Sequence, residues 1–142
     1  AEITQFTLFQ EAQWQLALAS FSLIMFAALY YLAPRISGAA WPSAGLVRGH
    51  YLASIIGFAV LIVSLAIAGW QQGTLLNDPA VSFETIATQI NPWLLVATAA
   101  QALLLVGNLA LLVNFVRLLF VKASDTSLSQ FRQPTNLEAT SS

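Results

Sequence analysis

The chain has no cysteine, one histidine, one methionine and few charged residues among its 142 positions. The lack of cysteine excludes disulfides, thiolate zinc sites, iron–sulfur clusters and cysteine nucleophiles. Charged residues make up only 8% of the sequence, against roughly a quarter in soluble domains. The net charge is −1 and the five Lys and Arg residues are scattered, which argues against a nucleic-acid partner, because phosphate binding needs clustered basic side chains.

Apolar residues, in contrast, account for 58% of the chain. Three runs without a charged residue extend from Trp14 to Ala33, from Tyr51 to Trp70 and from Trp93 to Val116. At ~1.5 Å per residue, each is long enough to cross a hydrocarbon core ~30 Å thick. The sequence therefore predicts an all-α membrane protein. Its three transmembrane helices cover about 12–33, 51–70 and 92–121 in one domain, 1–122, and a polar tail follows over 123–142.

Proline and turn residues suggest where these helices begin and end. Pro34 and Arg35 mark the end of the first helix, and Pro92 suits the first turn of the third. Residues 71–91 form either an ordinary loop or a short interfacial helix with Ser82 as its N-cap. The polar composition of the tail predicts that it is extended over a partner or disordered.

The distribution of positive charge predicts how the chain crosses the membrane. The N-terminal segment and the second loop contain no Lys or Arg, and all five basic residues lie in the first loop or at and beyond the end of the third helix: Arg35, Arg48, Arg117, Lys122 and Arg132. The positive-inside rule then places the N-terminus outside and the C-terminus in the cytoplasm. The four tryptophans lie near the ends of the apolar runs, as interfacial anchors do.

The sequence predicts no catalytic, cofactor-binding or metal-binding residues in this chain. It has no paired carboxylates within a span and no glycine-rich phosphate loop. His50 could be a metal ligand, but nothing nearby supplies the further ligands that a metal site needs, so we interpret it as a packing or interface histidine. Met25, in the middle of the first span, is interpreted as a packing residue.

Polar and small residues within the spans predict surfaces that face protein rather than lipid. Uncharged polar side chains are poorly tolerated in hydrocarbon, and small residues four positions apart let another helix approach closely. The predicted interface residues are Gln13, Gln15, Ala53, Gly57, Ser64, Ala68, Gln101, Gly107, Asn108 and Asn114. Either these faces only pack the three helices together, or some of them contact a partner polypeptide.

Several short motifs resemble a known family in their order and spacing. They are Phe6-Thr7, Ala28-Leu29-Tyr30-Tyr31-Leu32 running into Pro34-Arg35, His50-Tyr51, and Ala68-Gly69-Trp70-Gln71-Gln72-Gly73. Over about residues 6–114 the chain resembles the last three helices of the catalytic subunit of cbb-type heme–copper cytochrome c oxidases. The resemblance implies a multi-pass protein of the cell inner membrane.

The chain departs from that family at the heme ligands. The family's matching helix begins with a His-x-His pair that ligates two hemes, whereas this chain has Gln13-Trp14-Gln15. An amide is a poor iron ligand compared with imidazole. The resemblance therefore implies a heme-free accessory subunit that packs against the catalytic and cytochrome subunits of a terminal oxidase, with heme and copper bound in those partners.

Two other interpretations remain open. The chain could be a split part of the catalytic subunit that lines a shared active site or a proton or gas path, in which case Glu11, Gln13 and Gln15 would be the residues of interest. It could also be a small structural subunit of an unrelated membrane complex.

Overall fold

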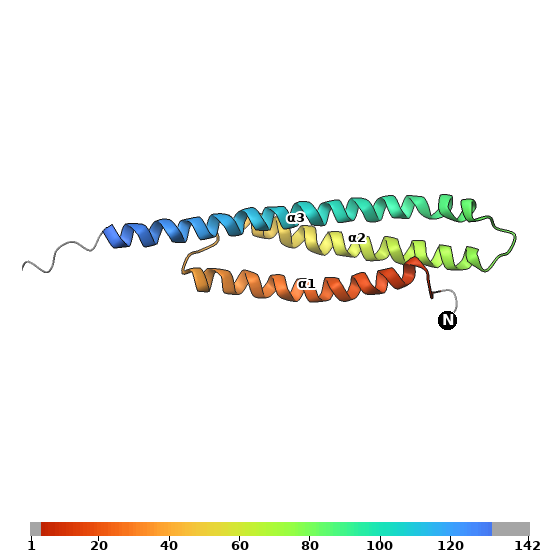
Figure 1. Ribbon diagram of the computed structural model, residues 1–142, viewed down its shortest axis with the longest axis horizontal. Helices are drawn as coiled ribbons and strands as arrows, with labels where there is room; N and C mark the ends of the chain where they lie inside the picture. Colours follow the sequence, from red (N-terminus) through yellow and green to blue (C-terminus); the bar gives the residue numbers. More distant parts are fainter. Residues whose placement is uncertain (1–3, 132–142) are drawn as a thin grey trace, which may run out of the picture.

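The computed structural model describes residues 4–131, with side chains to Val121, and consists of three long helices that run alternately up and down (Figure 1). They are α1 (Leu8–Ser37), α2 (Ala44–Leu76) and α3 (Phe83–Phe131). All three are long and apolar enough to span a membrane. The predicted all-α fold is confirmed over the described residues, with three helices that are each able to span a membrane, while the orientation of the termini stays a prediction.

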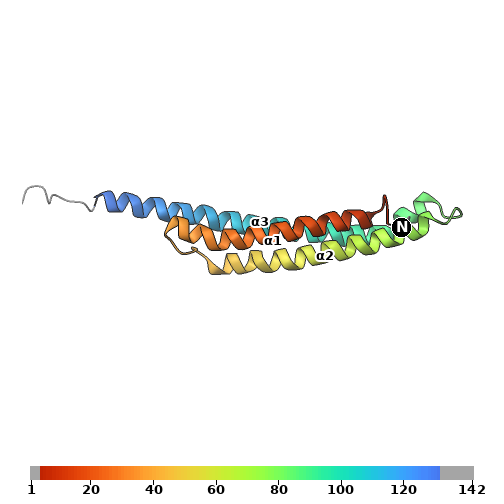
Figure 2. The ribbon, with the colours of Figure 1, turned by 90° about the horizontal axis from the view of Figure 1, so that it is seen from below.

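The three helices do not pack equally against one another. α2 contacts both α1 and α3 along much of its length, whereas α1 and α3 touch each other little. Figures 1 and 2 show α1 and α3 each lying along α2. The bundle therefore has a well-packed α2–α3 pair and an open side between α1 and α3.

The α2–α3 contact follows a heptad pattern. Buried positions on both helices recur at alternating spacings of three and four residues, which is the pattern of left-handed helix pairs that cross at about 20°. On α2 they are His50, Ser54, Gly57, Leu61, Ser64 and Ala68, and on α3 they are Ala97, Ala100, Gly107, Leu111, Asn114 and Leu118. Many of these residues are small, which lets the two backbones approach closely.

The first turn of α1 is held against α2 at Gly69. A Cβ atom on Gly69 would lie 1.9 Å from the backbone nitrogen of Phe9, so only glycine fits there. The side-chain oxygen of Gln72 accepts a hydrogen bond from the backbone nitrogen of Leu8 at 3.0 Å. Thr7 caps the helix by accepting from the backbone nitrogen of Phe9. The start of α1 is thus fixed on α2 by backbone contacts.

Three boundary predictions were wrong. α1 continues through Pro34 to Ser37 and ends at Gly38, whose φ of 72° suits glycine. Residues 71–91 are neither one loop nor a separate short helix, because α2 extends to Leu76 and α3 begins at Phe83. Pro92 therefore lies inside α3 and not in its first turn. The predicted cap was in the right place, since the Ser82 hydroxyl accepts from the backbone nitrogen of Thr85.

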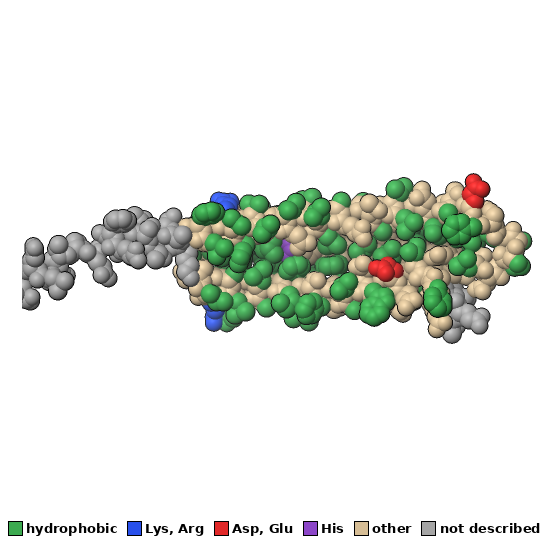
Figure 3. Space-filling view, viewed as in Figure 1, with side chains coloured by type: hydrophobic (Ala, Val, Ile, Leu, Met, Phe, Trp, Pro, Cys, Tyr) green, Lys and Arg blue, Asp and Glu red, His purple; other side chains and the backbone are tan. Residues whose placement is uncertain are grey.

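The tail prediction is tested only in part. α3 continues to Phe131, so residues 123–131 are helical rather than extended. The remaining residues of the tail, 132–142, lie outside the described part of the chain. On the face shown in Figure 3, basic side chains lie toward the end of the molecule where α1 ends, and acidic side chains lie away from it.

Candidate functional site

The main polar cluster of the bundle is built around His50 and draws on all three helices. The hydroxyl of Tyr30 on α1 bonds to Nδ1 of His50 on α2. On the other side of the ring, Nε2 lies 3.2 Å from Oδ1 of Asn108 on α3 and 3.4 Å from the hydroxyl of Ser54. His50 is fully buried. One side chain of α2 therefore joins α1 to α3, which hardly contact each other directly.

The hydrogen bonds around the ring fix its tautomer. Nδ2 of Asn108 donates to the carbonyl oxygen of Leu104 at 3.0 Å, so Oδ1 of the same amide faces His50 as an acceptor. Nε2 then carries the proton, and Nδ1 accepts from the Tyr30 hydroxyl. The edge of the Phe26 ring completes the enclosure, with the ring centroids 4.5 Å apart. Both ring nitrogens of His50 are thus engaged within the protein.

A second polar contact ties α3 to the loop before α2. Asn114 is fully buried, its Oδ1 accepts from the backbone nitrogen of Ser43 at 3.1 Å, and its Nδ2 donates to the Ser43 carbonyl at 2.9 Å. Nearby, Nε1 of Trp41 donates to the carbonyl of Tyr30 at 3.1 Å. The loop that joins α1 to α2 is therefore held on both neighbouring helices.

The predicted small residues lie at the helix contacts. A Cβ atom on Gly107 would lie 2.9 Å from Cβ of Ala53, and one on Gly57 would lie 2.7 Å from the side chain of Leu104. Ser64 and Ala68 are buried on α2 as well, and the Ser64 hydroxyl donates within its own helix to the Leu61 carbonyl. The contacts of Gly57, Gly107 and Ala53 lie between α2 and α3, and those of Asn114 lie between α3 and the loop before α2.

The predicted glutamines lie elsewhere. Gln13 and Gln101 are exposed, and Gln15 is half-buried with its amide donating to Oε1 of Glu11 at 3.0 Å. Asn108 is partly exposed although its oxygen reaches His50. Gln101 lies near the midpoint of the apolar segment Phe83–Val121. Its side-chain amide makes no hydrogen bond to any other described residue. The predicted interface set thus separates into buried packing residues and an exposed polar group.

Sequence reasoning missed Tyr30, Ser54 and Ser43 as polar partners. Ser54 could have been found, because a serine four residues after a histidine lies on the same helix face. Tyr30 and Ser43 carry no comparable signal, since their partners are 20 and 71 residues away in the chain.

The described side chains do not fit heme in the manner that the resemblance would require. The positions of the His-x-His pair hold amides, one of them bonded to Glu11. His50 is buried with both nitrogens engaged, and Met25 lies at an apolar surface groove. Within residues 4–121, no three His, Cys, Asp or Glu side chains are grouped as a metal site would need. Among the described residues, the positions of the family's heme ligands therefore hold amides, and the one imidazole has hydrogen-bond partners on both ring nitrogens.

Comparison with known proteins agrees with the resemblance seen in the motifs. Residues 3–103 match the family model for cytochrome c and quinol oxidase polypeptide I. A search of curated proteins finds no match. The matched segment covers most of the 142 residues, including α1, α2 and the first part of α3. The chain belongs to the cytochrome c and quinol oxidase polypeptide I family.

Proposed function

We propose that this chain is a heme-free accessory subunit of a heme–copper oxidase complex of the cbb type, and that it packs against the catalytic subunit in the cell inner membrane. Heme and copper are bound by the partner subunits in this proposal. The family membership supports a place in an oxidase complex. The Gln13-Trp14-Gln15 sequence supports a role without heme, since these amides replace the imidazoles on which heme ligation in the family depends.

The observation that carries the proposal is the exposure of Gln101 at membrane depth. Its amide lies near the middle of an apolar segment, on the lipid-facing surface of the bundle, without a partner among the described residues. A polar side chain in hydrocarbon is unfavourable unless another polypeptide supplies hydrogen-bond partners. The same segment already buries Asn114 and engages Asn108 within the bundle. Of these three side-chain amides, Gln101 is the one that is available to bond to a neighbouring helix.

Substitution at Gln101 tests the partner contact. With Gln101→Leu we expect the isolated chain to unfold as the unaltered chain does, because no described contact is lost, while its recovery with the oxidase falls severalfold. Ala99→Leu, an exposed change two residues away, is the matched control and leaves recovery unchanged. Equal recovery of both variants would contradict the proposed contact.

Purification in mild detergent tests the role as a whole. The chain is expected to migrate with oxidase subunits that carry the heme absorption, and the isolated chain is expected to have no Soret band. Migration of the chain alone, or a Soret band in the isolated chain, would refute the proposal.

The proposed orientation has the N-terminus outside and the C-terminus in the cytoplasm. The basic side chains at one end of the bundle support it (Figure 3). Because the chain has no cysteine, a maleimide reacts only with a cysteine that is introduced, and its reaction shows on which side of the membrane that position lies. Ser82→Cys should react with an impermeant maleimide in intact cells, and Ala40→Cys only after permeabilisation; the reverse result would overturn the orientation.

A further inference from the structure

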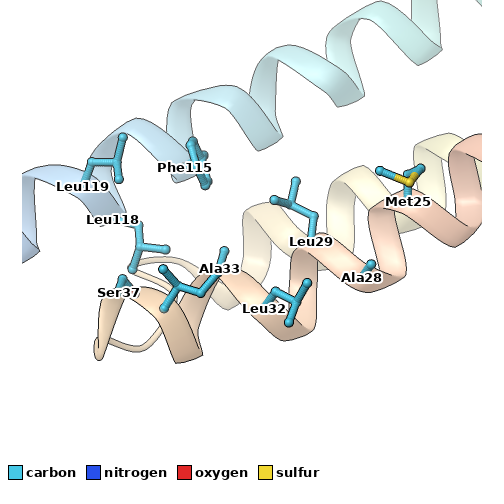
Figure 4. A pocket seen from close by; sticks show the side chains of 10 residues that line it. Met25, Ala28, Leu29, Leu32, Ala33, Ser37, Phe115, Leu118 and Leu119 are labelled. Carbon is cyan, nitrogen blue, oxygen red and sulfur yellow. The ribbon is translucent and has the colours of Figure 1, made fainter.

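An apolar groove lies between the C-terminal half of α1 and the facing part of α3 (Figure 4). It has a volume of about 330 Å³ and is open to the surface. Along α1 it extends from Met25 to Ser37, and on the other side it is bounded by Phe115, Leu118 and Leu119 of α3. The groove exists because α1 and α3 both pack on α2 and barely touch each other here. In a membrane, such a groove is filled by lipid or by another polypeptide.

The length of the groove suits one acyl chain. From Met25 to Ser37 the rise along α1 is about 18 Å, roughly half of a ~30 Å hydrocarbon core and hence the depth of one leaflet. An acyl chain that lies along the groove therefore stays within one leaflet, and its headgroup lies beside one end of the groove.

The walls of the groove present no polar group that needs a protein partner. Ser37 is the one polar residue among those that line it, and its hydroxyl already donates to backbone carbonyls and accepts from the backbone nitrogen of Ala39. The groove differs in that respect from the surface around Gln101, where an amide without a partner among the described residues is exposed. An acyl chain therefore fills the groove without leaving a polar group of its lining unpaired.

One basic side chain, Arg35, lies near the Ser37 end of the groove, where a lipid headgroup would sit. Arg35 is exposed and shares a face of α1 with Ala28 and Leu32, which line the groove. Its guanidinium carbon lies 4.1 Å from the centroid of the Tyr31 ring. A stacked guanidinium keeps its N–H groups directed sideways, which is the geometry that binds phosphate oxygens. A negatively charged headgroup complements this end of the bundle.

We propose that the groove binds one anionic phospholipid, with an acyl chain along Met25–Ser37 and the headgroup phosphate near Arg35. The site lies in the leaflet at the basic end of the bundle. The proposal does not depend on which oxidase subunits the chain contacts, because the occupant is lipid.

Native mass spectrometry of the full chain, released from micelles that contain equal amounts of phosphatidylglycerol and phosphatidylcholine, tests the site. One phosphatidylglycerol per chain is expected to be retained, with a preference of about fivefold, the contribution of one arginine near an anionic headgroup. Ala28→Phe fills the groove and should abolish retention. Ala27→Phe is the matched control, because Ala27 is exposed, adjacent in sequence and absent from the groove, and it should retain the lipid.

The charge contact is tested separately at exposed positions, so the result does not depend on whether Ala28→Phe folds. Arg35→Gln should reduce the preference for phosphatidylglycerol to near parity. Arg117→Gln is the control, since Arg117 lies on the side of α3 opposite Phe115 and Leu119, and it should keep the preference. Equal retention by Ala28→Phe and Ala27→Phe, or an unchanged preference in Arg35→Gln, would overturn the proposal, as would a crosslink from position 28 to a partner subunit in the purified oxidase.

Discussion

Asn114 and Ser43, which are 71 residues apart in the chain, are joined by two hydrogen bonds between one side-chain amide and one backbone unit. The Asn114 amide accepts from the backbone nitrogen of Ser43 and donates to the backbone carbonyl of the same residue. Because Ser43 is also the N-cap of α2, the same contact positions the start of that helix on α3. Asn114 is thus a structural residue, although an asparagine in an apolar helix could equally have faced a partner.

Replacement of Asn114 by leucine should destabilise the bundle. The change removes both hydrogen bonds and leaves the backbone nitrogen of Ser43 without this partner, while the Ser43 carbonyl still accepts from the backbone nitrogen of Val47 at 3.5 Å. We expect the free energy of unfolding to fall by about 1–3 kcal/mol. The measurement is an SDS titration in mixed micelles, followed by tryptophan fluorescence. Asn91→Leu, at an exposed position of α3, is the control and should change the unfolding midpoint little. Equal midpoints for the two variants would show that the contact contributes nothing.

The pair Tyr30 and Tyr31 offers a test of the His50 cluster. Tyr30→Phe keeps the ring but removes the hydroxyl that bonds to Nδ1 of His50, and a buried ring nitrogen is then left without its donor. We expect a loss of about 1 kcal/mol in the same unfolding assay, within the range for hydrogen bonds between membrane helices. Tyr31→Phe keeps the exposed ring beside Arg35 and should have almost no effect. If both changes are neutral, the cluster does not stabilise the bundle.

Two glycines of α2 should respond in opposite directions to alanine. At Gly69 the added methyl group would overlap the backbone of Phe9, so α1 must move away from α2, at a cost of about 1–3 kcal/mol. At Gly49, also within α2, no atom lies within 4 Å of the added carbon, and alanine should stabilise the helix by about 0.5–1 kcal/mol. Unfolding in mixed micelles distinguishes the two signs. Destabilisation by Gly49→Ala, or tolerance of Gly69→Ala, would contradict the packing described.

The sequence predicts the number and approximate position of the helices well, because uncharged runs of this length have few alternatives in a membrane. Helix ends were less predictable. Pro92 was expected in a first turn, but α3 begins behind the Ser82 cap, about two and a half turns earlier, and a proline is tolerated inside the helix. At Gly57 and Gly107 the missing side chain leaves room for Leu104 and Ala53 of the facing helix.

The candidate site was less accessible to sequence reasoning. The small and polar residues of the third span, such as Gly107 and Asn114, predicted a face that contacts protein, yet residue type alone does not tell whether that protein is α2 or another chain. Gln101 is adjacent to Ala100 in sequence but about 100° away around the helix, and this rotation separates a residue buried on α2 from one exposed to the membrane. The partners of His50 depend on how α1 and α3 are placed around α2, which no local pattern encodes.

Replacement of Gln13 and Gln15 by leucine separates the accessory role from participation in a shared active site. Gln13 is exposed and Gln15 bonds only to Glu11 on the same helix face among the contacts described, so the double change should not disturb the bundle. For an accessory subunit we expect the oxidase to assemble with normal turnover, because neither amide ligates heme or contacts the bundle's core. The assay is oxygen consumption by the purified complex, normalised to its heme content, with Gln10→Leu at another exposed position of α1 as the control. A tenfold or greater loss of turnover in a fully assembled complex would instead place these amides beside the reacting groups of the partner. Loss of a contact that only holds subunits together would lower the yield of the complex and leave its activity per heme unchanged.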